Sequence, residues 1–266
     1  MIPKIIHYCW FGGNPLPASA KKCIASWRKY LPDYEIKEWN ESNFDVNIIP
    51  YTAEAYKAKK YAFVSDYARF WILYKYGGLY FDTDVEVIKN MDDIIANGAF
   101  MGLEKKQAGA TPNCVGVAPG LGLGVNPGLG LGVNPGLGLG VNPGLGLYKE
   151  LLDVYDDKHL FSAFGKIGGT IVDITSKIMQ KKGIKRQSDG FLHCGEITIY
   201  PEEYFCPKNY YTAELTITPN TCAIHHYTAT WHKDTKTIFE KIKNRLFLMF
   251  VRYSVQITYA KNKYKN

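Results

Sequence analysis

Two aspartates separated by a single residue, Asp82 and Asp84, are the side chains best placed to do chemistry. They follow the short apolar run Leu79-Tyr80-Phe81, which predicts a buried strand that ends at the first carboxylate. On an extended chain, residues i and i+2 face the same side, so we expect both carboxylates to point to one place. Hard divalent ions such as Mg²⁺ and Mn²⁺ prefer oxygen ligands and leave positions for substrate phosphates. The pattern therefore predicts a metal–diphosphate site, with a solvated acidic turn as the alternative.

The element before this strand is a strongly apolar helix, predicted from Ala62 to Tyr76 and ended by the glycine pair Gly77-Gly78. Asp66 and Arg69 lie three residues apart in it and share one helix face. In so apolar a helix, this polar pair is expected either to face a cleft or to form an internal ion pair.

Two further segments carry side chains of interest. The apolar run from Ile2 to Trp10 predicts an early central strand, and Trp10 at its end is expected either to stack on a nucleotide base or to lie in the core. A late strand, Thr221–Tyr227, carries the adjacent histidines His225 and His226. Neighbouring residues of a strand face opposite ways, so only one of the two imidazoles can face the site.

Charge is concentrated near the end of the chain. Residues 233–266 hold nine Lys or Arg and two Asp or Glu, so the whole net charge of +7 lies in this segment. A basic amphipathic helix, predicted over 236–259, favours contact with an anionic membrane surface; packing against the main body is the alternative. We expect a domain at 1–232 and a basic tail at 233–266.

Between positions 117 and 147 the chain repeats an octapeptide, which in its commonest form reads Val-Asn-Pro-Gly-Leu-Gly-Leu-Gly. The copies begin at Val117, Val125, Val133 and Val141, and we expect one or two of them to be native and the others to enlarge a surface loop. The six cysteines are scattered, which favours reduced thiols over a zinc site or disulfides. We expect neither a signal peptide nor a membrane span, which favours a cytoplasmic location. Together with the basic tail, this predicts a protein at the inner face of the cell membrane.

Several segments together resemble one family, the DXD-containing sugar transferases. This family includes bacterial capsular-polysaccharide transferases, yeast outer-chain mannosyltransferases and, more distantly, the glucosyltransferase domain of clostridial toxins. The resemblance rests on the segments Ile2–Gly12, Ser65–Arg69, Gly77–Asp84 and Ala223–Tyr227, and on Trp231.

The resemblance implies an α/β fold of the type A glycosyltransferase class, and a retaining enzyme that uses Mn²⁺ or Mg²⁺ and a UDP- or GDP-sugar. Asp84 would ligate the metal directly, whereas Asp82 would act through water or touch the ribose. Asp66 and Arg69 match the pair that holds the donor sugar, and Trp10 matches the base-stacking tryptophan. Asp66, Arg69, Asp82 and Asp84 form the expected catalytic set.

The remaining residues follow from the same resemblance. His226, rather than His225, is expected to complete the metal site; His7 is grouped with the donor-binding residues, and Trp231 matches a tryptophan over the diphosphate. The sequence departs from the family at Ala229-Thr230, where relatives often carry Gly-Ser. A polysaccharide or lipid-linked glycan is the expected acceptor, and no nucleic acid is expected as a partner.

Two other functions remain open at this point. Phosphatases of the haloacid dehalogenase type also carry Asp-x-Asp after an apolar strand, but they need Thr or Val two residues past the second aspartate, where Glu86 stands here. A catalytically silent sugar-binding protein, with the repeats blocking the acceptor, is the other alternative.

Overall fold

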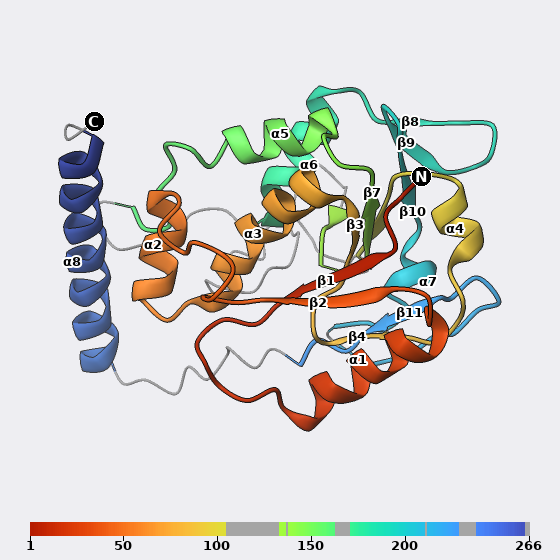
Figure 1. The fold of residues 1–266 in the computed structure, drawn as a ribbon, viewed down its shortest axis with the longest axis horizontal. Coiled ribbons are helices and arrows are strands. Elements are labelled where there is room, and N and C mark those ends of the chain that lie inside the picture. The colour runs from red at the N-terminus through yellow and green to blue at the C-terminus, as the bar shows by residue number, and fades with distance from the viewer. Residues whose placement is uncertain (105–132, 137, 163–170, 211, 229–237, 264–266) are drawn as a thin grey trace.

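The computed structural model describes residues 1–104, 133–136, 138–162, 171–210, 212–228 and 238–263. In this part of the chain the strands are β1 (Ile5–Cys9), β2 (Glu35–Trp39), β3 (Gly78–Tyr80), β4 (Val85–Val87), β5 (Phe100–Leu103), β6 (Val133–Asn134), β7 (Leu139–Val141), β8 (Lys185–Arg186), β9 (Leu192–Cys194), β10 (Ile197–Tyr200) and β11 (Ala223–His225). A nine-stranded sheet has the order β2-β1-β3-β7-β5-β10-β9-β8, with β6 beside β5 (Figure 1). β4 and β11 form a separate antiparallel pair.

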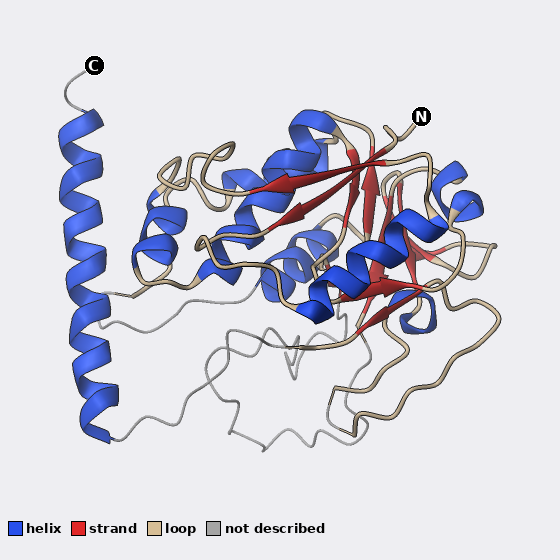
Figure 2. Cartoon of the chain, turned by 60° about the horizontal axis from the view of Figure 1, so that its bottom comes forward, coloured by secondary structure: helices blue, strands red, loops and turns tan. Residues whose placement is uncertain are grey.

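The large sheet is mixed and is covered on both faces. β1 runs parallel to β2 and β3, and β10 runs parallel to β5, whereas β7 joins β3 to β5 in antiparallel pairing. The described helices are α1 (Ala18–Tyr30), α2 (Pro50–Lys57), α3 (Tyr61–Tyr76), α4 (Asp92–Ala96), α5 (Gly146–Asp153), α6 (Ile171–Lys181), α7 (Glu202–Phe205) and α8 (Ile238–Lys263). α3, α5 and α6 lie on one side of the sheet and α1 on the other, with the β4–β11 pair, while α8 stands at one end of the molecule (Figures 1 and 2).

Alternation along β1 shows how the sequence produces these layers. Ile6 and Tyr8 belong to the core on the α1 side, whereas Cys9 belongs to the core on the α3 side. α1 is amphipathic: its buried residues Ile24 and Trp27 are three apart and lie on one stripe, which packs against this first core. Burying a large apolar side chain contributes roughly 1.5–3 kcal/mol, so both layers stabilise the sheet strongly.

The glycine pair that ends α3 is required by the backbone. Gly77 and Gly78 have φ angles of 64° and 94°, in a region that side chains with a Cβ disfavour. A Cβ on Gly78 would also lie 2.6 Å from the carbonyl oxygen of Ile5 on β1. The pair therefore turns the chain directly from α3 into β3, which pairs with β1.

The octapeptide tract contributes to the centre of the sheet. The third copy, residues 133–140, contributes β6 and the first two residues of β7, which ends at Val141 of the fourth copy; β7 lies between β3 and β5. Gly140 packs against the ring of Phe100, where a Cβ would overlap the ring. The third copy is therefore part of the sheet and not of a surface loop. The first two copies lie outside the described residues, so the expectation that extra copies enlarge a surface loop stays a prediction.

The α/β fold class expected from the sequence is confirmed, in agreement with the type A glycosyltransferase fold that the resemblance implies. α3 corresponds to the apolar helix predicted before Gly77-Gly78, and α8 is present near the end of the chain, where a basic helix was predicted. The division into domains at residues 232 and 233 stays a prediction.

Candidate functional site

The Asp-x-Asp motif lies in a tight turn between the two sheets. The amide of Val85 donates to the carbonyl oxygen of Asp82 at 3.0 Å, so residues 82–85 form a β-turn. The sequence predicted an extended motif with both carboxylates pointing to one place, and this prediction is wrong. The motif turns, and its two carboxylates contact different groups. Asp82 faces α3, and Asp84 faces β11.

Asp82 is held by an arginine. Arg69 Nη1 lies 3.3 Å from Asp82 Oδ2, and Nη2 lies 3.2 Å from Asp82 Oδ1. The same Nη2 lies 3.1 Å from Asp66 Oδ1, and the guanidinium sits over the ring of Tyr80 at 4.9 Å. The Asp66–Arg69 pair expected on one helix face thus exists, and it extends to the first aspartate of the motif.

The arginine of this group is buried, but both carboxylates keep some exposure. The side chain of Arg69 is 5% exposed, while those of Asp66 and Asp82 are 13% and 29% exposed. Burial raises the pKa of Asp66 to about 7, although Arg69 opposes the shift. A planar guanidinium that joins two part-exposed carboxylates is a rigid polar platform at the edge of the core.

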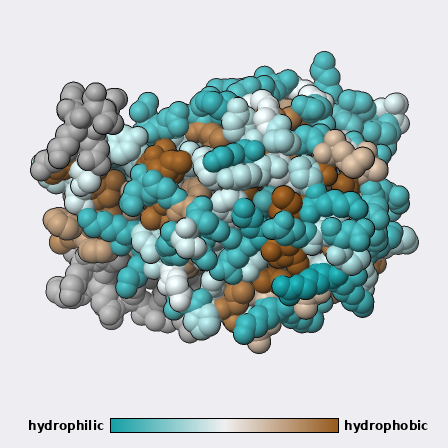
Figure 3. Space-filling view, in the orientation of Figure 1, coloured by the Kyte–Doolittle hydropathy of each residue, from teal (hydrophilic) through white to brown (hydrophobic). Residues whose placement is uncertain are grey.

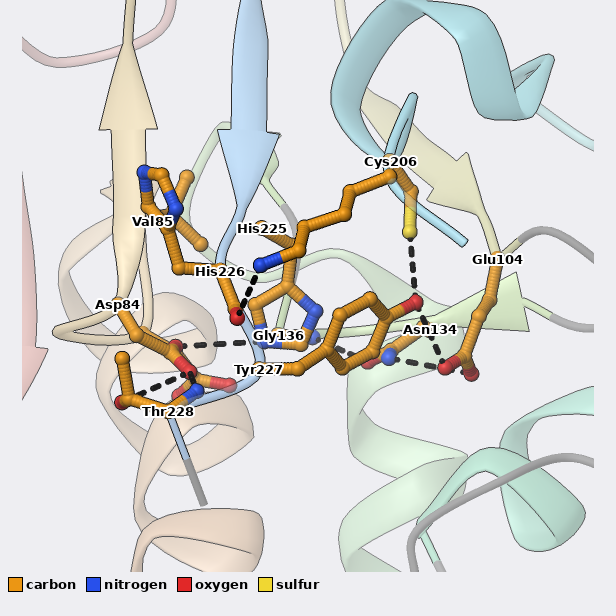
Figure 4. Close-up of polar contacts among 12 residues, drawn as sticks. Asp84, Val85, Glu104, Asn134, Gly136, Cys206, His225, His226, Tyr227 and Thr228 are labelled. Atoms are coloured by element: carbon orange, nitrogen blue, oxygen red, sulfur yellow. Dashed lines mark hydrogen bonds and ion pairs between the residues drawn. The ribbon is translucent and has the colours of Figure 1, made fainter. Parts of the chain in front are cut away.

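Asp84 forms the second half of the site. His225 Nε2 lies 3.2 Å from Asp84 Oδ1, and the backbone amide of Thr228 donates to Asp84 Oδ2 at 3.0 Å (Figure 4). Burial by itself would raise the pKa of Asp84, but His225 outweighs it and holds this pKa well below the usual range. For His225, burial by itself would lower the pKa, but Asp84 outweighs it and raises this pKa well above its ordinary value.

His226 points the other way. Its Nε2 lies 2.7 Å from Glu86 Oε2, on the side of the strand away from Asp84 (Figure 4). The expectation that a single histidine faces the motif agrees with this geometry, but the choice of His226 does not. The pairing of β11 with β4 sets His225 opposite Val85, next to Asp84, so His225 replaces His226 as the candidate metal ligand.

The residues around Asp84 suit a divalent ion that is shared with a substrate. Octahedral Mg²⁺ or Mn²⁺ places neighbouring ligands about 3 Å apart, since each bond is about 2.1 Å long. The carboxylate and imidazole of Asp84 and His225 have this spacing. Within the described ranges, no group of three or more His, Cys, Asp or Glu side chains gathers at one point. Two protein ligands completed by phosphate oxygens and water are typical of Mg²⁺ sites in enzymes that bind nucleotides.

The other described residues that were expected in the site are not part of the Arg69 cluster or of the Asp84–His225 pair. Trp10 is partly exposed at the end of β1, where its Nε1 donates to the carbonyl oxygen of Asn14 at 2.6 Å. His7 is buried, and both ring nitrogens are used, by Gly77 and by Trp39. The expectation that His7 contacts the donor is therefore not supported, because its bonds fix it within the core. Trp231 lies outside the described residues.

Sequence reasoning missed a polar network beside the motif. The amide of Asp82 donates to the carbonyl oxygen of Gly136 at 3.2 Å, and the amide of Gly136 donates to Asn134 Oδ1 at 2.8 Å. Glu104 Oε2 accepts from Asn134, and Glu104 Oε1 accepts from the hydroxyl of Tyr227 (Figure 4). A charged residue directly after the apolar strand β5 was the available signal for Glu104; the repeats gave none for Asn134 or Gly136.

The chain is similar to several known glycosyltransferases. Residues 17–101 match the model of the glycosyltransferase sugar-binding region containing DXD motif. The chain is 32% identical over 127 residues to inositol phosphoceramide mannosyltransferase 3 of Schizosaccharomyces pombe, an alignment that covers 45% of this chain and 34% of that protein. It is 35% identical over 106 residues to an uncharacterized glycosyltransferase of Acanthamoeba polyphaga mimivirus, covering 38% and 42% of the two chains. The solved structure of PaToxG glycosyltransferase superposes with a TM-score of 0.45 at 18% identity, over 68% of this chain and 70% of that one.

The matched region contains the Arg69 cluster and the turn with both aspartates, and it ends before His225. The chain spans only about a third to two fifths of the length of the curated relatives it matches. Residues 17–101 thus match the sugar-binding region of DXD-motif glycosyltransferases, which confirms the resemblance that the sequence indicated.

Proposed function

We propose that this chain is a retaining, metal-dependent glycosyltransferase that moves a sugar from a UDP- or GDP-sugar to a polysaccharide or lipid-linked glycan. The observation that carries the proposal is the joining of Asp66, Arg69 and Asp82 into one cluster beside the Asp84–His225 pair. A cation site and a polar cluster that meet at the two aspartates of one turn suit a donor whose diphosphate and sugar are covalently linked.

Asp84 and His225 would hold the metal ion, and Asp82 would touch it through water or contact the ribose. When bound, such an ion neutralises the negative charge that develops on the departing diphosphate. Arg69 orients the carboxylates of Asp66 and Asp82, whose exposed oxygens accept hydrogen bonds from sugar hydroxyls. Trp10 at the end of β1 offers a flat apolar face to the nucleotide base, because its indole nitrogen is already bonded to Asn14.

The retaining outcome is proposed with a front-face route, in which the leaving phosphate takes the proton of the acceptor hydroxyl. No protein nucleophile is needed in this route. Asp82 is poorly suited to act as one, because Arg69 binds both of its oxygens. The same contacts weigh against a phosphatase that uses Asp82 as its nucleophile.

We further propose that the enzyme works at an anionic membrane surface, in the synthesis of a bacterial capsule or other surface polysaccharide. Leu248 and Val251 of α8 are buried against the body, while Phe247, Phe250 and Tyr253 are 48%, 64% and 66% exposed. Figure 3 shows hydrophobic side chains on the surface at the end of the molecule where α8 stands. No described helix is long and apolar enough to cross a bilayer. An exposed apolar face on a helix rich in Lys and Arg suits binding in the plane of the membrane.

The proposal is tested by screening UDP- and GDP-sugars in thermal-shift measurements, with and without Mn²⁺. One nucleotide class is expected to raise the melting temperature, and only when the divalent ion is present. The product of the best donor is then analysed by NMR, where retention of the anomeric configuration is expected. Stabilisation by no donor would contradict the proposed activity, and an inverted product would contradict the retaining mechanism.

A further inference from the structure

Glu104 is a buried carboxylate that the expected chemistry does not use. Glu104 follows β5 directly and is 7% exposed. Its burial raises the pKa of the carboxyl group. Glutamate is seldom buried unless its oxygens are satisfied by specific partners. Its two oxygens meet donors from two different segments: Oε1 lies 3.1 Å from the hydroxyl of Tyr227, and Oε2 lies 3.4 Å from Asn134 Nδ2 (Figure 4).

The first oxygen fixes the turn after β11. Tyr227 has a φ of 55°, a left-handed conformation that is uncommon for a bulky aromatic residue and persists only where its surroundings enforce it. The hydroxyl of Tyr227 is bound between Glu104 and the Cys206 thiol, and its ring centroid lies 4.1 Å from that of His225. The next residue, Thr228, donates from its amide and its hydroxyl to Asp84 Oδ2. Holding Tyr227 therefore sets the positions of two groups that contact Asp84.

The second oxygen fixes the loop against the other aspartate. Asn134 accepts from the amide of Gly136, whose carbonyl oxygen in turn accepts from the amide of Asp82. This loop is tightly packed, because a Cβ on Gly136 would overlap Asp82 Oδ2. One carboxylate is thus connected to both aspartates of the motif: to Asp82 through the hydrogen bonds of Asn134 and Gly136, and to Asp84 through the Tyr227 hydroxyl and the backbone that leads to Thr228.

We propose that Glu104 is a positioning residue for the metal–diphosphate site, which acts through Tyr227 on His225 and Asp84 and through Asn134 on Asp82. This inference rests on the proposed function, because it assigns a role in binding the metal and nucleotide that the function requires. Residues that orient metal ligands typically change metal affinity by 10–100-fold when they are replaced.

The experiment measures the Kd of Mn²⁺ by titration calorimetry in the presence of saturating UDP or GDP. The variants are Glu104→Gln, which leaves one acceptor for two donors, and Tyr227→Phe, which removes only the hydroxyl. Glu196→Gln, at an exposed position between β9 and β10, is the matched control. A double variant combines Glu104→Gln with Tyr227→Phe. Melting temperatures are recorded for the wild type and all four variants, and Tyr227→Phe carries the test if Glu104→Gln does not fold.

Both site variants are expected to bind Mn²⁺ about tenfold or more weakly, while the control stays within twofold of the wild type. The double variant should lose less affinity than the two single losses combined, since both changes break the same connection. A lower melting temperature with unchanged Mn²⁺ affinity would show a purely structural role and overturn the inference. A wild-type protein that binds neither Mn²⁺ nor nucleotide would instead overturn the proposed function.

Discussion

His225 and Asp84 form an ion pair, with Nε2 and Oδ1 3.2 Å apart, across the two-stranded sheet of β4 and β11. This pair joins residues that lie far apart in the chain and sets one histidine against the motif. Its neighbour His226 is bound to Glu86 on the opposite side. The two adjacent imidazoles are thus a natural pair of test and control.

Replacing His225 by Ala is expected to weaken Mn²⁺-dependent binding of the nucleotide about tenfold or more, because a nitrogen ligand is lost. Replacing His226 by Ala should change this binding by less than twofold. Titration calorimetry with Mn²⁺ and UDP or GDP measures both variants. An equal loss in the two, or a larger loss in His226→Ala, would restore His226 as the ligand.

The third and fourth octapeptide copies supply another matched pair, Gly136 and Gly146. A Cβ at Gly136 would overlap Asp82 and lie 3.0 Å from Arg69 Nη1, whereas nothing lies within 4 Å of a Cβ at Gly146, the first residue of α5. Overpacking typically costs about 1–3 kcal/mol of folding free energy. Because the added Cβ would displace Asp82, Gly136→Ala should weaken donor binding roughly tenfold or more. Gly146→Ala should leave binding and the melting temperature unchanged or slightly higher. Normal donor binding in Gly136→Ala would show that this loop does not constrain Asp82.

Much of this arrangement could be predicted from the sequence, because local rules determine it. The end of α3 follows from the conformational freedom of Gly77 and Gly78, and the Asp66–Arg69 contact follows from helical spacing. The choice between His225 and His226 could not be predicted, since alternation says that they diverge but not which one faces the motif. The pairing of β11 with β4 decides it, and that register is a tertiary property.

The octapeptide tract shows a different limit. Residues 125–132 and 133–140 have the same sequence, so no local rule could say which copy enters the sheet. The tract also lacks charged residues, and its repeated Asn-Pro-Gly is typical of turns, so the short strands β6 and β7 could not be predicted. Glu104 was overlooked for a related reason: its two partners lie in this tract and near β11, far away in the sequence.

The histidine in the core predicts a dependence of stability on pH. Burial lowers the pKa of His7 from an ordinary value of 6.5 to about 4, so the unfolded chain binds a proton between these values and the folded chain does not. Stability should therefore fall as the pH falls through this window. Between pH 7.5 and pH 5, His7 should account for about 2 kcal/mol of the loss in unfolding free energy.

Urea unfolding of the wild type and of His7→Gln at both pH values measures this contribution. Glutamine keeps one donor and one acceptor but does not titrate in this range. The variant is expected to be less stable overall, but to lose about 2 kcal/mol less on acidification than the wild type does. Equal losses in the two proteins would show that His7 is not the group responsible.

The exposed face of α8 predicts binding to anionic membranes. The double variant Phe250→Ser, Tyr253→Ser should sediment much less with vesicles that contain phosphatidylglycerol, because apolar side chains no longer enter the interface. The matched control is Leu215→Ser, Ile217→Ser, at residues that are 46% and 56% exposed outside α8. Wild-type protein should bind phosphatidylcholine vesicles weakly, and raised salt should release it from anionic ones. Equal sedimentation of both double variants would contradict membrane binding through α8.

The role proposed for the turn with Asp82 and Asp84 is to bind a metal-bound nucleotide sugar for transfer. It is tested most directly by the initial rate of sugar transfer with Mn²⁺, using the donor found in the screen, for the wild type and for Asp84→Asn. Mn²⁺-dependent transfer is expected for the wild type, and a rate at least a hundredfold lower, roughly 2.7 kcal/mol or more, is expected for Asp84→Asn. Transfer by Asp84→Asn at the wild-type rate, or wild-type transfer that persists after chelation of divalent ions, would contradict it.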